Sequence, residues 1–198
     1  MTEPDRHPFL YVVVCAAGVA AGVGRLITAA RARGWEVGVI ATPTAATDGF
    51  FDVAAAEELT GRPIRARSRR PGETRPFPAP DAVVVAPATF NTVNKWAAGI
   101  ADTLALSTLC ESLGLGVPVA VLPCVGGALA AHPAYRESLD RLRATGVRFG
   151  DPYAGQAGEF AWEGVLDLVE EAGRAGRSVE SPSQPTVGPT SMPPVNTS

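Results

Sequence analysis

Short apolar runs rich in valine recur along this chain, and helix-length segments separate them. The four longest runs cover residues 10–16, 35–41, 82–86 and 117–122. Runs of this length predict buried strands, and an Ala-, Leu- and Ile-rich segment over residues 19–33 predicts a helix between the first two. Strands that alternate with helices form a mainly parallel sheet with helices on both of its faces. The pattern therefore predicts an α/β fold.

The rest of the chain completes this fold and bounds its domain. We expect a short edge strand over residues 147–149 and an irregular loop over residues 61–80. Further helices are expected over residues 52–60, 103–113, 133–144 and 160–172, and residues 94–98 lead into the second of these. A chain of 198 residues with 46% hydrophobic content has room for one well-buried domain. We predict a Rossmann-like (flavodoxin-like) three-layer sandwich over residues 9–175, after an N-terminal tail over residues 1–8. Residues 176–198 are rich in Pro, Ser and Thr and are expected to form a disordered tail.

Composition argues against several classes of partner. The formal net charge is -3, and no basic run lies beside aromatic residues, so a nucleic-acid partner is not expected. Arginines gather between residues 62 and 75, where they are either solvated or able to attract an anionic substrate. The three cysteines lack the spacing of a metal site, so we expect no metal. With no cationic leader and no apolar run of about 20 residues, we expect no membrane association and a reducing, cytoplasmic location.

Polar turns follow three of the predicted strands. After residues 82–86, the turn over residues 87–92 places two hydroxyls and a carboxamide beside a proline, and Thr42 follows the second strand. Gly18 opens the first turn and leaves room for a ligand near helix N-terminal amides, which favour phosphate. Open α/β sheets bind ligands at the carboxyl ends of their strands, so we predict a phosphorylated cofactor there. The glycine spacing fits neither a dinucleotide-binding fingerprint nor a P-loop, although a turn without any ligand stays possible on this pattern alone.

The turn over residues 87–92 resembles the PxSANT signature of the homo-oligomeric flavin-containing cysteine decarboxylases, a flavoprotein family. Pro87, Asn91 and Thr92 match it, Thr89 replaces the serine and Phe90 departs from it. The run from Lys95 to Leu104 is similar to the family's next segment. The resemblance implies FMN as cofactor and a homo-oligomer, a trimer or a dodecamer. It implies cofactor contacts from three turns and a fourth strand end, at Gly18, Val19, Thr42, Pro87, Ala88, Thr89, Phe90, Asn91, Thr92 and Cys124.

The same resemblance shows where this sequence departs from the family. The family's catalytic histidine lies on the loop before the third strand, and residues 61–80 contain no histidine; His132 resembles an ordinary helix-start residue. Of the family's substrate clamp only Pro123 remains, with Gly126 in place of the asparagine, and no late cysteine occurs near residues 153–155. We therefore leave the catalytic residues unassigned and expect the standard oxidative decarboxylation to be altered or lost.

Several alternatives remain open at this point. The chain could be a flavin-dependent lyase for a different carboxylic acid or for a peptide with a C-terminal cysteine. It could also be a non-catalytic or regulatory subunit whose site a partner chain completes, or a flavin-free nucleotide binder. Phe90 and Trp96 are either flavin contacts or core aromatics. Cys124 is either an inert thiol or a substitute catalytic group, and Glu73 with the arginines of its loop could replace the histidine as an acid or as an anion clamp.

Overall fold

The protein folds around one five-stranded sheet in which every strand is parallel to its neighbours. The structure is a computed structural model that describes residues 7–154 and 159–179. The strands are ordered β2-β1-β3-β4-β5 across the sheet. Their bounds are Phe9–Val14 for β1, Glu36–Ala41 for β2, Ala82–Ala88 for β3, Val119–Pro123 for β4 and Arg148–Phe149 for β5. The parallel Rossmann-like sheet predicted from the sequence is confirmed.

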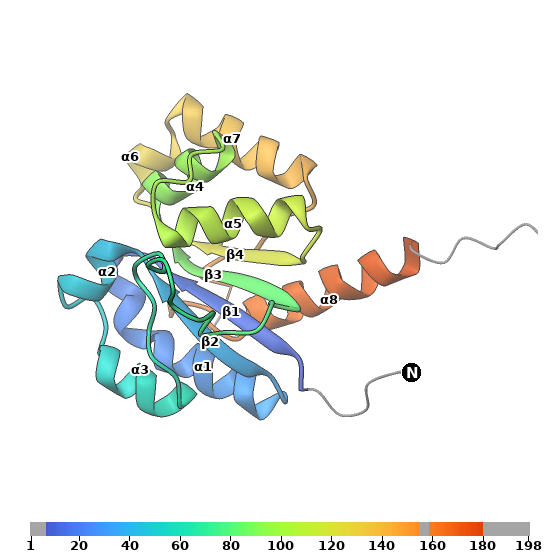
Figure 1. Ribbon diagram of the computed structural model, residues 1–198. Coiled ribbons are helices and arrows are strands. Elements are labelled where there is room, and N and C mark those ends of the chain that lie inside the picture. Colours follow the sequence, from blue (N-terminus) through green and yellow to red (C-terminus); the bar gives the residue numbers. More distant parts are fainter. Residues whose placement is uncertain (1–6, 155–158, 180–198) are drawn as a thin grey trace, which may run out of the picture.

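Helices cover both faces of the sheet, as Figure 1 shows. On one face lie α1 (Val23–Ala32), α3 (Val53–Thr60) and α8 (Gly164–Val179), and on the other lie α4 (Phe90–Ala97), α5 (Leu104–Gly114) and α7 (Pro133–Ala144). Alternate residues of β1 point to opposite faces: Leu10 and Val12 join one hydrophobic cluster, whereas Tyr11 and Val13 join the other. The predicted three layers are therefore present.

The helix expected over residues 103–113 is confirmed as α5. Residues 94–97 do not simply lead into it, because they belong to a separate helix, α4. Helix α4 ends at its C-cap Ala98, and Gly99 then adopts a left-handed backbone with φ of 72°. Thr103 caps the start of α5 by accepting a hydrogen bond from the Leu106 amide at 3.2 Å. A glycine C-terminal to one helix and a threonine before the next are ordinary stop and start signals.

Other boundaries also differ from the sequence prediction. The segment after β1 begins with a 3-10 helix, η1 (Gly18–Gly22), before α1, and two short helices, α2 (Pro43–Thr47) and α6 (Gly127–Ala130), were not expected. Helix α8 begins at Gly164 instead of residue 160, because Phe160 and Trp162 are buried in non-helical backbone before it. It extends to Val179, beyond residue 172, where the sequence predicted the end of this helix. Of the predicted tails over residues 1–8 and 176–198, residues 1–6 and 180–198 lie outside the described residues.

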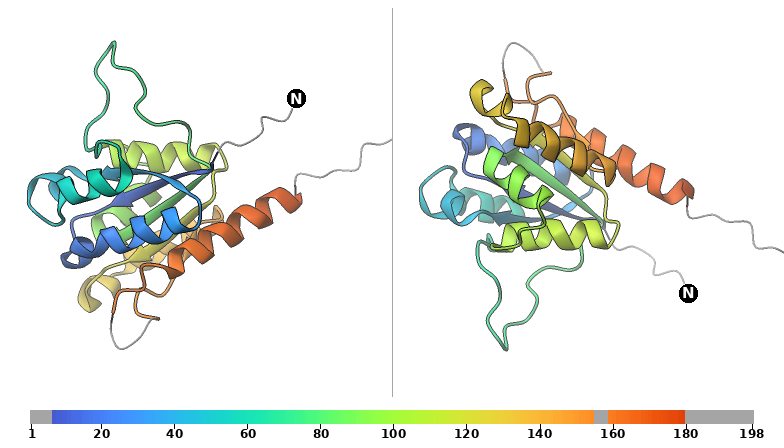
Figure 2. Two further views of the ribbon diagram at one scale, coloured as in Figure 1. Left: turned by 90° about the horizontal axis from the view of Figure 1, so that it is seen from below. Right: turned by 90° about the horizontal axis from the view of Figure 1, so that it is seen from above.

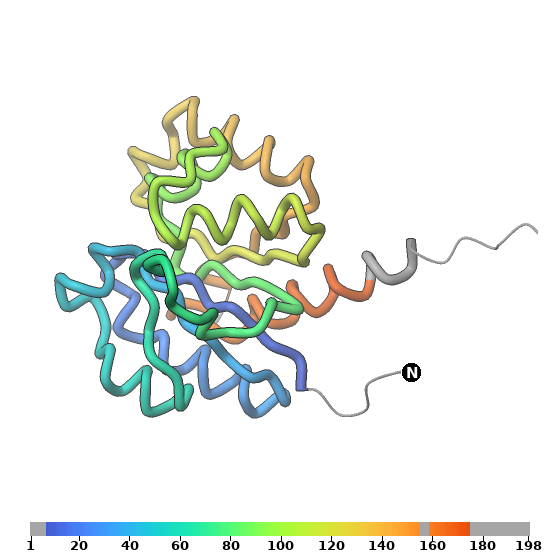
Figure 3. Tube along the Cα trace, viewed as in Figure 1, coloured from blue at the N-terminus to red at the C-terminus, as the bar shows by residue number. Residues whose placement is uncertain are grey.

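The irregular loop between α3 and β3 crosses the front of the sheet and then extends away from it (Figures 2 and 3). One end is attached to β2, where the Arg65 amide donates to the Val39 carbonyl at 3.0 Å and the Ala41 amide donates to the Arg65 carbonyl at 2.8 Å. At the other end Phe77 is buried, with its ring 5.8 Å from that of Tyr11. The loop is therefore fixed to the sheet at both ends.

Candidate functional site

The turns predicted to bind a cofactor lie together at the carboxyl edge of the sheet. Backbone hydrogen bonds connect them. The Thr42 amide after β2 donates to the Val14 carbonyl at 2.9 Å, and the Cys15 amide after β1 donates to the Pro87 carbonyl at 3.2 Å. After β4, the Cys124 amide donates to the Ala88 carbonyl at 2.8 Å. The first, second and third turns and the end of β4 thus form one continuous edge.

The turn between β3 and α4 is held by a small buried network of hydroxyls and a thiol. Thr89 caps α4, and its hydroxyl lies 3.1 Å from the hydroxyl of Thr92, which is itself buried. The Cys15 thiol, at the end of β1, donates to the Thr92 hydroxyl at 3.3 Å. Complete burial raises the pKa of the Cys15 thiol, which keeps it neutral. This network fixes the third turn against the first strand. The preceding Ala86–Pro87 bond is cis.

Asn91 and Thr92 lie in the first turn of α4, and not in a loop before the helix as the sequence suggested, because Thr89 already serves as the cap. Their side chains point to different surroundings: Thr92 is buried, whereas Asn91 is exposed at the edge. Ala88 is the last residue of β3 and is fully buried, so its contribution to a ligand is limited to its backbone. Asn91 is therefore the most accessible side chain of this turn.

The first turn leaves open space beside Gly18. A Cβ atom placed on Gly18 would meet nothing within 4 Å, and Gly18 itself is exposed. Its neighbour Val19 is half-buried and packs against the main core. By contrast, a Cβ on Gly22 would lie 2.7 Å from the Trp162 indole nitrogen. The start of η1 can therefore accept a ligand, while its end is closed by Trp162.

The two aromatic candidates differ in position. Trp96 is 2% exposed and belongs to the core, so the interpretation as a core aromatic is confirmed. Phe90 is half-buried and stacks on Tyr135 with ring centroids 5.7 Å apart. His132 meets the Phe90 ring edge-on at 5.9 Å. Phe90 thus presents part of its ring at the carboxyl edge.

His132 has a structural role in this arrangement, as predicted. It is the N-cap of α7, and its Nδ1 accepts a hydrogen bond from the Ala134 amide at 3.1 Å. A ring nitrogen that accepts a hydrogen bond carries no proton. Protonation at Nδ1 would therefore break this cap.

Sequence reasoning missed one contact at this edge, between Cys124 and Tyr153. The Tyr153 hydroxyl interacts with the half-buried Cys124 thiol, and this interaction raises the pKa of Tyr153, with burial adding to the effect. The two residues come from the end of β4 and from the loop after β5. Only the tertiary fold brings them together, so no local sequence signal could have shown the pair.

Residues 7–154 and 159–179 were searched for a metal site and for a membrane-spanning helix. No group of three or more His, Cys, Asp or Glu side chains could hold a metal ion there. No helix in that part of the chain is long and apolar enough to cross a bilayer.

The fold and its edge of polar turns define a Rossmann-like α/β domain. A family model described as Flavoprotein matches residues 2–173. The chain therefore belongs to the flavoprotein family, which confirms the resemblance and the flavin cofactor that this resemblance implies.

Curated relatives match parts of longer proteins. The coenzyme A biosynthesis bifunctional protein CoaBC of Mycobacterium bovis is 31% identical in an alignment over 180 residues that covers 86% of this chain and 41% of that protein. A cysteine/cysteine sulfinic acid decarboxylase from an unknown prokaryotic organism is 37% identical over 76 residues, 38% of this chain and 20% of that protein. The chain thus spans less than half the length of these relatives.

Solved structures share the fold. The FMN-dependent cysteine decarboxylase TvaF from thioviridamide biosynthesis superposes with a TM-score of 0.70 at 21% identity, covering 85% of this chain and 99% of that one. The cypemycin decarboxylase CypD gives a TM-score of 0.69 at 24% identity and covers 85% of this chain and 95% of that one.

Proposed function

We propose that this chain binds FMN at the carboxyl edge of its sheet and that the oxidative decarboxylation associated with its relatives is altered or lost. The proposed FMN binding is supported by the backbone hydrogen bonds that bring three polar turns together at the carboxyl edge of the sheet. Thr42, Thr89 and Asn91 supply hydroxyl and amide groups there, and the open space beside Gly18 admits a phosphate near backbone amides. FMN, when bound, would supply the redox chemistry, while these residues bind and orient it.

The reaction part of the proposal rests on the proton-transfer groups at the edge. The loop over residues 61–80, where the family resemblance implies a histidine, contains none. His132 uses its Nδ1 to cap α7. General acid–base catalysis needs a positioned group that can gain and lose a proton near neutral pH. The Cys124 thiol raises the pKa of the nearby Tyr153 hydroxyl, so this hydroxyl does not supply such a group.

A second candidate is a flavoprotein subunit whose site another chain completes. Gly18, Asn91 and Gly126 are all exposed in the isolated chain, so the proposed flavin edge is open to a partner. The exposure of these three residues is consistent with a homo-oligomer in which the flavin site lies at subunit contacts.

The first experiment identifies the cofactor and tests the proposed contacts. Purified protein should show the absorption bands of oxidised flavin, and the chromophore released on denaturation should have the mass of FMN. Asn91→Ala changes an exposed side chain and should lower FMN retention without lowering stability; combined with Thr89→Ala, it should abolish retention. Because Thr89 is also a helix cap, Asp52→Ala is the matched control: Asp52 caps α3 by accepting from the Ala55 amide at 2.9 Å. A colourless protein that takes up no added FMN refutes the cofactor assignment.

The second experiment tests the reaction. FMN-loaded protein is incubated with free cysteine and with a peptide ending in cysteine, and released CO2 is measured, with an active cysteine decarboxylase as the positive control. We expect no release from the isolated chain. Turnover of either compound overturns the proposed loss of the standard reaction, and turnover only after addition of a second, copurifying chain supports the partner-completed site.

A further inference from the structure

One surface feature that the proposed function leaves unexplained is a cavity between the loop over residues 61–80 and helix α5. Its volume is about 330 Å³. None of the proposed flavin contacts lines it. The loop contributes Arg65, Arg69 and Arg75, and α5 contributes polar side chains that include Ser107 and Glu111. Both ends of the loop are fixed to the sheet, so the cavity is already formed in the folded chain.

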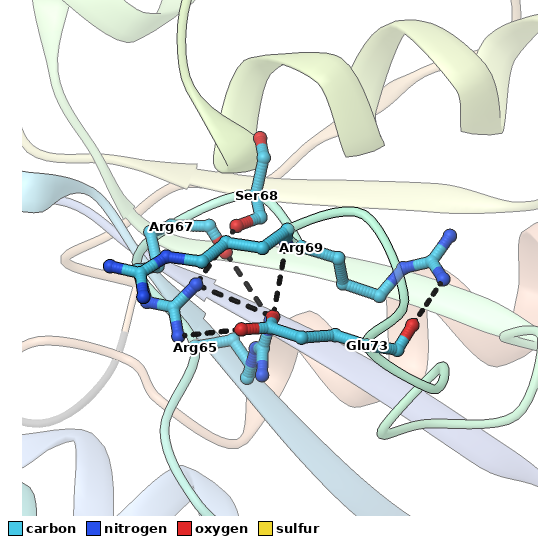
Figure 4. A network of polar contacts seen from close by, with 6 residues as sticks. Arg65, Arg67, Ser68, Arg69 and Glu73 are labelled. Atoms are coloured by element: carbon cyan, nitrogen blue, oxygen red, sulfur yellow. Dashed lines mark hydrogen bonds and ion pairs between the residues drawn. The ribbon is translucent and has the colours of Figure 1, made fainter.

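Glu73 organises the arginine loop from within, as Figure 4 shows. Its two carboxylate oxygens accept hydrogen bonds from the Arg67 guanidinium at 3.1 and 3.3 Å, and one of them also accepts from the Arg70 amide at 3.1 Å. These contacts hold the pKa of Glu73 below its usual range, with the Arg67 hydrogen bond as the largest cause. Arg67 and Glu73 therefore neutralise each other, and neither charge is left for the cavity.

The three arginines that line the cavity form no salt bridge in the part of the chain that the structure describes, although the charge of Arg65 also acts on Glu73. Among the described residues, the Arg65 guanidinium donates to the Arg67 carbonyl at 3.4 Å and that of Arg69 donates to the Glu73 carbonyl at 3.1 Å. Arg75 interacts electrostatically with Tyr11. Each guanidinium has five N–H donors, so most remain available. Three guanidinium groups and the one lining carboxylate, Glu111, give the cavity a formal charge of +2, on a chain whose net charge is -3.

We propose that this cavity is a binding site for a small dianion, a phosphate ester or a dicarboxylate. Guanidinium groups bind both kinds of oxyanion through paired, charge-assisted hydrogen bonds. The volume lies at the lower end of the range for small-molecule sites, which fits a compact ligand. Apolar side chains on the wall, such as Leu104 and Val117, would contact its carbon skeleton. The site is separate from the proposed flavin contacts, so this proposal can be tested independently of the proposed cofactor.

The test is calorimetric titration of the full-length protein with a small phosphate monoester, glycerol phosphate, and, separately, with succinate at low ionic strength. We expect binding of at least one, and the probe that binds tells phosphate from carboxylate chemistry. Arg69→Gln and Arg75→Gln should each weaken binding about tenfold, the effect of one charge-assisted hydrogen bond. The matched control is Arg70→Gln, which removes the same charge from the same loop but does not line the cavity. It should leave affinity nearly unchanged.

Three results would overturn the proposal. The first is that neither anion binds. The second is that Arg70→Gln loses as much affinity as Arg69→Gln and Arg75→Gln do. The third is that Arg69→Gln and Arg75→Gln both keep the affinity of the parent protein. Thermal unfolding of each variant verifies that it is folded. The flavin spectrum of each variant should match that of the parent, because the cavity lies apart from the flavin contacts. Loss of anion binding with flavin retained would therefore separate this site from the proposed function.

Discussion

Replacing Thr92 with valine tests whether the buried hydroxyl network holds the third turn in place. Valine has nearly the shape of threonine, so the change removes the hydroxyl and leaves little cavity. It deletes the hydrogen bond to Thr89 at 3.1 Å and the one from the Cys15 thiol at 3.3 Å. One ordinary buried hydrogen bond and one weak thiol bond together contribute about 1–2 kcal/mol to the free energy of unfolding. For a chain of this size, that loss lowers Tm by about 2–8 °C.

The assay is urea unfolding of parent and variant, followed by circular dichroism, together with the FMN content of each purified protein. Because Thr92 fixes the turn that carries Asn91, FMN retention should fall with stability. Thr92→Ser keeps the hydroxyl and should recover most of the retention. The control is Ser112→Ala, which removes another buried hydroxyl, bonded to the Thr108 carbonyl at 2.8 Å within α5. It should cost stability and leave retention intact. Parental stability and retention in Thr92→Val would refute the reasoning.

Three further outcomes follow from packing and burial. Gly38→Ala should lower the free energy of unfolding in urea by about 1–3 kcal/mol, because the new Cβ would lie 2.9 Å from the Phe77 ring; an unchanged midpoint would contradict this. In native protein an alkylating reagent should modify Cys124 and Cys110 before Cys15, as read by mass spectrometry, and early labelling of Cys15 would argue against its burial. Burial raises the pKa of the Cys15 thiol, so its stabilising effect is complete below the unfolded pKa of about 8.5 and is lost as pH rises through the folded pKa. The stability difference between parent and Cys15→Ala should therefore shrink at alkaline pH, and a constant difference would oppose this assignment.

The sequence predicted the parallel sheet because its strands are buried on both faces and read as continuous apolar runs. It also placed the three polar turns at one edge, since the carboxyl ends of parallel strands meet there. The sequence did not predict α4 as a separate helix. Residues 94–98 read as a lead into the helix over residues 103–113, although Gly99 and Thr103 mark a break between two helices. The pair of Cys124 and Tyr153 could not be predicted, because it depends on how the loop after β5 folds back over β4.

The proposed cofactor binding and the proposed loss of the reaction depend on different kinds of residue. The proposed flavin edge is made by backbone turns, a helix cap and short polar side chains, and the hydrogen bonds of Cys15 and Thr92 hold these in position without any charge. Proton transfer instead needs one titratable group in the right place. The loop that would supply it carries arginines, which stay protonated in proteins and cannot act as bases. Their charge suits an anion instead. Arginines stand in the loop where the family resemblance implies a histidine, which supports both the proposed loss of proton transfer and the proposed anion site.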